Sequence, residues 1–216
     1  MEEKNHVISI AVPEGKTAKW NEDGMLQLVD ATPDVLDPTV PITERVKTFM
    51  DAIKIIEAKG DPDGLIKEWN TINFKNTKND LRAFLMLGII VAALNDGWKP
   101  SFKEGEQRWC PYMILYTKSE IEDMPDADKD DICLQRWLAG GSSDDGSSCG
   151  LGCSDSCTAW SHSHSYFSAR LVLKSEQLAL YCGKQFIRLW SQYYCGRDCK
   201  PWREIDFTDD DNENDD

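Results

Sequence analysis

The chain has 216 residues, 41% of them apolar, and its 38 acidic and 24 basic residues give a formal net charge of −14. This length and apolar content suffice for one or two domains with a core of their own. The acidic surplus argues against a surface that grips phosphate backbones, because such binding depends on Lys and Arg. We therefore expect no direct contact with nucleic acid.

The N-terminal residues and the longest apolar run indicate where in the cell the protein is expected. The first six residues are polar and acidic, whereas a secretory signal carries positive charge followed by an apolar core. The most apolar run, Phe84 to Leu94, is about half of the ~20 residues that span a bilayer. We expect a soluble protein of a reducing compartment, not secreted by a signal peptide and without a membrane segment, in which the eight cysteines are free thiols or metal ligands.

Residues 1–30 have the pattern of a small β module. Val7 to Val12 alternates like a strand, and Thr17 to Asn21 is joined through Asp23-Gly24 to the apolar stretch Met25 to Val29. Because Asp-Gly tolerates the positive φ of a tight turn, the last two stretches predict a β-hairpin.

A proline-rich segment, 31–42, separates this module from a compact domain over 43–203. Its three prolines interrupt any helix, so we predict an extended linker. Thr43 then has the character of an N-cap, and an apolar stripe runs on to Gly60. This pattern predicts a helix over 44–59.

The centre of the compact domain is predicted to be an apolar helix over 80–95. Its apolar residues cover most of the circumference, which indicates neighbours on several sides, and Gly97 provides a stop. A strand is predicted at 109–116, where Pro111 favours the edge of a sheet or a bend. Two further elements follow, a short helix at 118–124 and a strand at 133–138.

Residues 140–165 are rich in Ser, Gly, Asp and Cys, a composition that predicts a long surface loop. After it, residues 167–173 alternate in part like a half-buried strand, and Ser175 caps a predicted helix that extends to about Tyr193. Gly183 lies inside this helix, where it costs about 1 kcal/mol relative to Ala, so we predict a close approach by another element there.

These patterns together predict an α+β fold, with a small N-terminal β module and a compact domain built on the central apolar helix and a C-terminal strand-helix pair. Residues 204–216 form a like-charge block with little to bury, for which we expect disorder. Such an acidic tail either keeps the chain in solution or docks onto a basic partner.

The sharpest local signal for chemistry is a set of soft ligands within 140–165, namely Cys149, Cys153, Cys157, His162 and His164. Zinc binds these residue types, but structural zinc sites favour C-x2-C or C-x4-C spacings over the x3 spacing found here. Three interpretations stay open: a structural zinc, a redox or disulfide pairing, and incidental free thiols. A closed zinc site would staple the loop and would supply no catalysis.

No catalytic or cofactor-binding residue is predicted. The chain has three histidines, and although His162 and His164 adjoin serines, neither a G-x-S-x-G elbow nor a glycine-rich phosphate loop is present. The aromatic residues near the C-terminus lie at helical spacing, which favours a core over base stacking.

Three stretches in this order resemble one family. They are ITERVKTFMDA at 42–52, AALNDGWKP at 92–100 and SARLVLKSEQLALYCGKQFIRLW at 168–190. Together they are similar to uncharacterised proteins of phages and prophage-like elements of gut Bacteroidales. The chain departs from that pattern at Cys182 and Arg188, and members differ greatly in the long loop, so the loop cysteines are not expected to carry the shared function.

The resemblance brings no established activity, but it implies a phage setting, with the host cytoplasm and the virion as locations. Our first hypothesis is a non-enzymatic phage protein, virion-associated or assembly-related, that binds protein partners through an adaptable surface such as the 140–165 loop. One alternative is an intracellular accessory that inhibits or recruits a host nucleic-acid enzyme through its acidic surface. Another is a zinc-stapled binding module.

Overall fold

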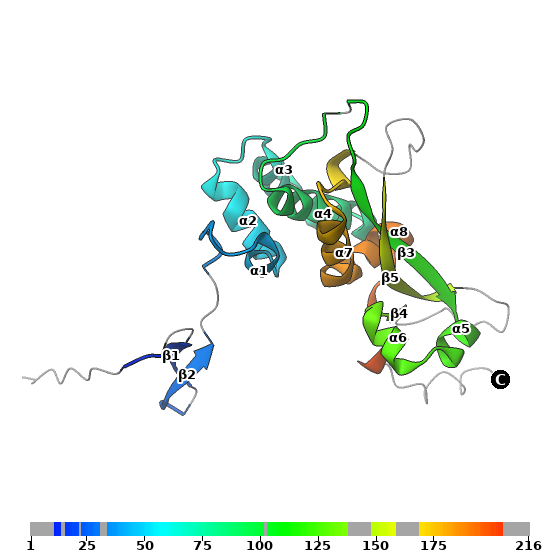
Figure 1. Ribbon diagram of the computed structural model, residues 1–216, viewed down its shortest axis with the longest axis horizontal. Helices are drawn as coiled ribbons and strands as arrows, with labels where there is room; N and C mark the ends of the chain where they lie inside the picture. Colours follow the sequence, from blue (N-terminus) through cyan, green and yellow to red (C-terminus); the bar gives the residue numbers. More distant parts are fainter. Residues whose placement is uncertain are drawn as a thin grey trace, which may run out of the picture.

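The structure is a computed structural model that describes residues 11–13, 16–21, 23–30, 34–101, 103–137, 148–158 and 169–204 (Figure 1). Along the chain the elements are β1 (Lys16–Trp20), β2 (Leu26–Asp30), α1 (Ile42–Arg45), α2 (Phe49–Ala58), α3 (Leu65–Thr71), the 3-10 helix η1 (Phe74–Asn76), α4 (Asn79–Asn95), β3 (Trp109–Thr117), α5 (Lys118–Asp123), α6 (Asp126–Asp131), β4 (Gln135–Trp137), β5 (Ser148–Thr158), η2 (Ala169–Leu171), α7 (Glu176–Gln185), α8 (Ile187–Cys195), β6 (Cys199–Pro201) and η3 (Trp202–Glu204). Helices and antiparallel sheets are both present, so the predicted α+β class is confirmed.

Two buried clusters of side chains lie in the compact part of the molecule. The helical core gathers large side chains from α2, α4, α7 and α8, with Trp190 fully buried. The sheet core lies around β5 and contains Ile121, Ile132, Leu134 and Leu151. Among the described residues, no helix is long and apolar enough to cross a membrane.

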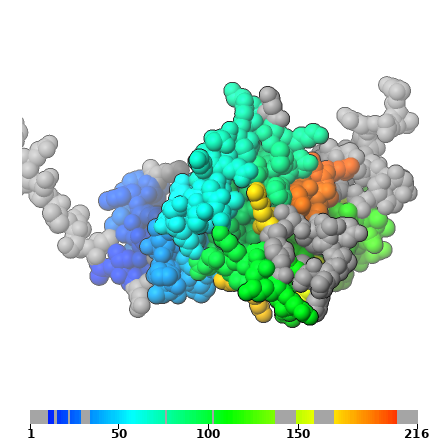
Figure 2. Space-filling view, turned by 90° about the horizontal axis from the view of Figure 1, so that it is seen from above, coloured from blue at the N-terminus to red at the C-terminus, as the bar shows by residue number. Residues whose placement is uncertain are grey.

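The predicted hairpin is confirmed. Strands β1 and β2 pair antiparallel, with Trp20 opposite Leu26 and Ala18 opposite Leu28. Gly24 takes the positive φ that the turn requires, at 75°. Both views show the hairpin (blue) at one end of the molecule (Figures 1 and 2). The strand predicted at 7–12 lies largely outside the described residues, and 11–13 form no regular structure.

The extended conformation predicted for the linker is wrong for residues 34–41, which form two consecutive turns. Asp34 and Asp37 each accept a hydrogen bond from the backbone N–H two residues later, and this local bonding favours turns over an extended chain. Arg45 holds the turns in place by donating to the carbonyl oxygens of Val35 and Val40, at 3.4 and 2.9 Å.

The helix predicted at 44–59 divides into α1 and α2, because a stronger cap lies inside it. The Thr48 side chain accepts from Asp51 N–H, and the Asp51 carboxylate accepts from Thr48 N–H, which is a capping box. The predicted cap at Thr43 is therefore replaced by Thr48. Helix α4 matches the central helix predicted at 80–95, packs against α2 and α8, and ends at Asp96 in the left-handed conformation.

The larger sheet is antiparallel in the order β3-β5-β4-β6. Strand β3 lies at the edge, as Pro111 predicted. The long surface loop predicted at 140–165 is wrong where the structure describes it, since β5 pairs with both β3 and β4 inside the sheet. Residues 138–147 and 159–168 lie outside the described residues, as does the acidic tail from 205 onward.

Strand β5 lies inside the sheet because its small residues let neighbours approach closely. A Cβ added at Gly152 would lie 2.6 Å from Ile132 Cδ1, and one at Gly150 would lie 2.9 Å from the Gln135 carbonyl oxygen. Glycine tolerates such approach, at a cost in strand propensity. The same small residues give the segment the amino-acid composition of a loop.

The C-terminal helical region confirms one prediction and corrects two. An added Cβ at Gly183 would lie 2.4 Å from Cys153 Sγ and 2.8 Å from Pro111 Cβ, so the predicted close approach is confirmed. The strand predicted at 167–173 is wrong for its described residues, 169–173: residues 169–171 form η2, and Leu173 makes only an isolated bridge with Trp109. The predicted cap at Ser175 is confirmed, but the helix divides at Phe186 into α7 and α8.

Contacts distant in sequence close the helical core. The Tyr181 hydroxyl donates to the Val46 carbonyl oxygen at 2.8 Å, and Gln185 Nε2 donates to the Lys47 carbonyl oxygen at 2.9 Å. Both acceptors belong to the short segment between α1 and α2, where backbone carbonyls need hydrogen-bond partners from elsewhere in the fold. The beginning and the end of the compact domain are therefore joined directly.

Candidate functional site

A cleft of about 450 Å³ lies between the α2–α3 turn and the chain that follows α4. Its floor is apolar and comes from α2 and α4, with Ile56, Gly88 and Val91 buried there. Its rim carries polar and charged groups, among them Asp61 and Lys99. An apolar cavity of this size with a few converging polar groups is typical of a ligand-binding site. We call it the α2–α4 cleft.

One wall of the cleft is a turn with several residues of positive φ. Gly60, Asp61 and Gly64 have φ values of 78°, 47° and 70°. Asp61 N–H donates to the Ile56 carbonyl oxygen at 3.0 Å, which closes the C-terminus of α2. A non-glycine residue in this region is uncommon and costs free energy, and such residues often cluster at functional sites.

The Asp61 carboxylate contributes one satisfied and one unsatisfied oxygen. Its Oδ2 accepts from the N–H groups of Ile66 and Lys67, at 3.1 and 3.0 Å, and so caps the first turn of α3. Its Oδ1 is buried and has no hydrogen-bond partner among the described residues. An acceptor in this state is a site that a donor on a ligand could satisfy.

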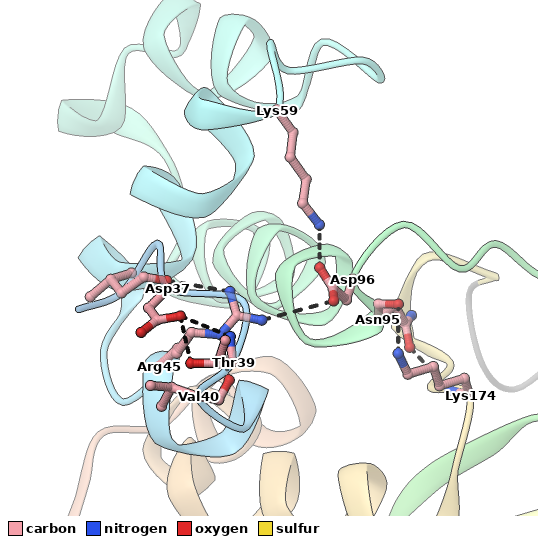
Figure 3. A network of polar contacts seen from close by, with 9 residues as sticks. Asp37, Thr39, Val40, Arg45, Lys59, Asn95, Asp96 and Lys174 are labelled. Atoms are coloured by element: carbon pink, nitrogen blue, oxygen red, sulfur yellow. Dashed lines mark hydrogen bonds and ion pairs between the residues drawn. The ribbon is translucent and has the colours of Figure 1, made fainter. Parts of the chain in front are cut away.

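The opposite wall is fixed by Asn95, which is buried at the end of α4. Its Nδ2 donates to the Val172 carbonyl oxygen at 2.9 Å, and its Oδ1 accepts from Lys174 N–H at 3.0 Å. Lys174 Nζ also donates to the Asn95 carbonyl oxygen (Figure 3). These bonds tie α4 to the segment before α7.

Next to Asn95, Asp96 joins three parts of the chain. Its carboxylate accepts from Lys59 at the end of α2, and its Oδ2 lies 3.8 Å from Arg45 Nη2 (Figure 3). The hydrogen bond from Lys59 is the main cause that lowers the pKa of Asp96 below its usual range, and the charge of Arg45 adds to it. Asp63 and Lys99 form a second ion pair between the same two walls.

The structure separates the predicted zinc ligands. Cys149, Cys153 and Cys157 follow one another along β5, and a strand advances about 3.3 Å per residue. Four residues therefore span about 13 Å, too far for these three thiols to share one ion. Within the described part of the chain, no group of three or more His, Cys, Asp or Glu is placed to hold a metal. His162 and His164 lie outside the described residues, so their part in a metal site stays a prediction.

A different surface stands out on the hairpin. Directly opposite residues of an antiparallel pair lie on one face, so Trp20, Leu26, Ala18 and Leu28 share a face. Trp20 is 72% exposed, Leu28 49% and Leu26 40%. No side chain of residues 16–21 or 23–28 belongs to the helical core or the sheet core, or packs against either. We call this surface the hairpin face.

The sequence contains residues typical of the turns in the α2–α4 cleft and the hairpin face, but no local pattern marks either surface as a site. The hairpin was predicted, but not that its apolar face stays uncovered. Pro62, Asp63 and Gly64 are residue types typical of a turn, yet only the fold brings this turn opposite Asn95 and Lys99.

Comparison with known proteins adds nothing to this geometry: no protein-family model, no curated protein and no solved structure matches the chain.

Proposed function

We propose that this chain is a non-enzymatic binding protein that acts through protein contacts, with the hairpin face as its contact surface. The observation that supports the proposal is the exposure of Trp20, Leu26 and Leu28 together on one side of a two-stranded sheet. A two-stranded hairpin is at best marginally stable in water without packing partners. Apolar patches of this kind mark interaction sites, and Trp is frequent among residues that dominate binding energy.

The setting in this proposal is the one that the family resemblance implies, a virion-associated or assembly-related phage protein. The 140–165 loop is no longer our candidate surface, because its described part, 148–158, is a strand inside the sheet. No described contact favours the zinc-stapled alternative. The intracellular accessory remains the alternative outcome of the test.

The test is quantitative mass spectrometry of density-purified particles from the element that encodes this chain, compared with the lysate of infected cells. We compare the natural chain with Trp20→Ser/Leu28→Ser on the hairpin face. The control is Thr17→Ser/Gln27→Ser, on the other face of the same hairpin. We expect the natural chain and the control in particles at a fixed ratio to the major structural protein, and a loss of at least about tenfold for the first variant, which is about 1.4 kcal/mol of binding.

Equal incorporation of both variants would contradict the role of the hairpin face. Absence of the natural chain from particles, with abundance in cells, would support the intracellular accessory instead. Thermal unfolding of both variants is expected to match that of the natural chain, because the hairpin side chains do not pack on either core.

The α2–α4 cleft favours a second function, the binding of a group with an apolar stem and a donor tip. The Asp61 Oδ1 accepts no hydrogen bond within the described chain, and Gly88 leaves open space on the floor. An arginine or lysine side chain of a protein partner has this chemistry. We propose that N-acetyl-arginine methylamide binds there, measured by NMR titration of the backbone amide signals of 60, 61, 63, 64 and 95–99.

Gly88→Leu is the blocking variant for this second function, because the new side chain projects into the cleft. We expect it to remove the chemical-shift changes, while Gly105→Asn, which tolerates the positive φ of a turn outside the cleft lining, leaves them in place. Shift changes that persist in Gly88→Leu, or that are absent in the natural chain, would exclude the cleft as this site.

A further inference from the structure

Cys110 on β3 and Cys157 on β5 lie directly opposite each other in the sheet. Their Sγ atoms are 3.1 Å apart, about 1 Å more than the ~2.05 Å bond of a disulfide. Opposite residues of an antiparallel pair have Cα atoms about 4.5–5.5 Å apart, within the range of about 4.4–6.8 Å that disulfides span. The two thiols can therefore bond without a change in strand pairing.

The two thiols differ in access. Cys110 is completely buried, whereas Cys157 is partly exposed. Burial, followed by the contact with Cys157, raises the pKa of Cys110 above its usual range. A reagent in solution therefore meets Cys157 first, and Cys110 reacts only through its neighbour.

We propose that Cys110 and Cys157 form a cross-strand disulfide by exchange with a low-molecular-weight disulfide such as oxidised glutathione. The Cys157 thiolate attacks one sulfur of that disulfide, forms a mixed disulfide and releases one small thiolate. The Cys110 sulfur then attacks Cys157 Sγ and releases the second small thiolate. The protein loses two electrons and two protons, and the small disulfide gains both as two thiols.

This bond would join the edge strand to its neighbour and close residues 110–157 into a loop. Loop closure stabilises mainly by restricting the unfolded chain. For a loop of this length in a chain of this size, the expected rise in the midpoint of thermal unfolding is about 10 °C. The chain would then have a dithiol form in a reducing compartment and a disulfide-bonded form outside it. This inference is independent of the hairpin face.

The experiment maps disulfides in the full-length chain after equilibration in glutathione buffers of increasing oxidised fraction, with rapid alkylation of the remaining thiols. Trypsin isolates Cys110 in residues 109–118, and cleavage before Asp155 separates Cys157 from Cys149 and Cys153. We expect the Cys110–Cys157 linkage to be the first intramolecular link to appear, together with the rise in the unfolding midpoint.

The variant Cys157→Ser should lose both the link and the rise in the midpoint. The control Cys195→Ser, which changes another partly exposed thiol on α8, should keep both. Peptide mapping of the natural chain needs no variant, so the test stands even if Cys157→Ser folds poorly. No Cys110–Cys157 link at any buffer ratio, or earlier linkage of either thiol to another cysteine, would overturn the proposal.

Discussion

The helical core and the sheet core differ in what their central element contributes, which is large side chains from α4 in the first and closely approached glycines of β5 in the second. The helical core is filled by large residues such as Leu87 and Trp190, both fully buried. The sheet core depends on small residues of β5, where Gly150 and Gly152 leave room for isoleucines. Removing volume should therefore damage the first core, whereas adding volume should damage the second.

This difference shows that a buried apolar core can be built in two ways. In the helical core, periodic large residues determine which face is buried. In the sheet core, the partner side chains Ile121 and Ile132 supply the apolar atoms, while the strand supplies backbone that can be approached closely. Each core should therefore be most sensitive to the opposite kind of substitution.

Trp190→Ala should lower the free energy of unfolding by about 4 kcal/mol, because it empties a completely buried site in the helical core. It also leaves the Cys182 carbonyl oxygen without the hydrogen bond from Trp190 Nε1. The measurement is equilibrium unfolding in urea. The matched control is Trp20→Ala on the exposed hairpin, with an expected change below about 0.5 kcal/mol. Similar losses for both tryptophans would contradict the assignment of this core.

Gly183→Ala should lower the free energy of unfolding by about 3 kcal/mol, because the new methyl group collides with Cys153 and Pro111 of the sheet. Gly88→Ala is the control, since it is also a helical glycine but has no atom within 4 Å of an added Cβ. There the better helix propensity of Ala should stabilise by up to about 1 kcal/mol. Denaturant unfolding measures the change in the free energy of unfolding for both variants. Changes of the same sign would show that α7 does not pack closely against the sheet at Gly183.

Asp96→Asn should lower the free energy of unfolding at pH 7 by less than about 1 kcal/mol, because the carboxylate is 39% exposed and solvent screens it. The pKa of Asp96 is lowered in the folded protein, so its contribution is present above the unfolded pKa of about 4 and is lost as pH falls through the folded pKa. Natural chain and variant should thus converge in stability below about pH 4. Asn tolerates the left-handed backbone at this position, so strain is not added.

Lys59→Gln tests whether the hydrogen bond from Lys59 is what lowers the pKa of Asp96. We expect its loss to resemble that of Asp96→Asn, and the double variant to lose little more than either single one. Additive losses in denaturant unfolding, or a difference that grows as the pH falls, would mean that Lys59 is not the partner that matters.

Sequence patterns predicted the helical half of the fold better than the sheet half. The apolar circumference of α4, the Ser175 cap and the close approach at Gly183 all follow from local rules, and the structure confirms them. Strand β5 follows no such rule, because its Gly, Ser and Cys residues show little alternation in hydrophobicity. Its burial is decided by residues on α5 and before β4, which no local pattern connects to it.

The candidate sites also divide into features that local sequence patterns predict and features that depend on tertiary contacts. The thiol pair could not be predicted, since only strand register places Cys110 opposite Cys157. The α2–α4 cleft likewise combines a turn at 60–64 with one at 95–99, and their proximity comes from helix packing. The hairpin could be predicted from its turn, but the exposure of Trp20 depends on what the rest of the chain leaves uncovered.

The bonds from Tyr181 and Gln185 back to residues 46 and 47 join parts of the chain that are synthesised far apart in time. Helix α4 packs against α8, which leaves the ribosome about 90 residues later. At about 5–20 residues per second, the apolar surface of α4 waits roughly 5–20 s for the helix that covers it. We therefore expect a nascent chain of this protein to be a client for chaperones at the ribosomal exit until translation is nearly complete.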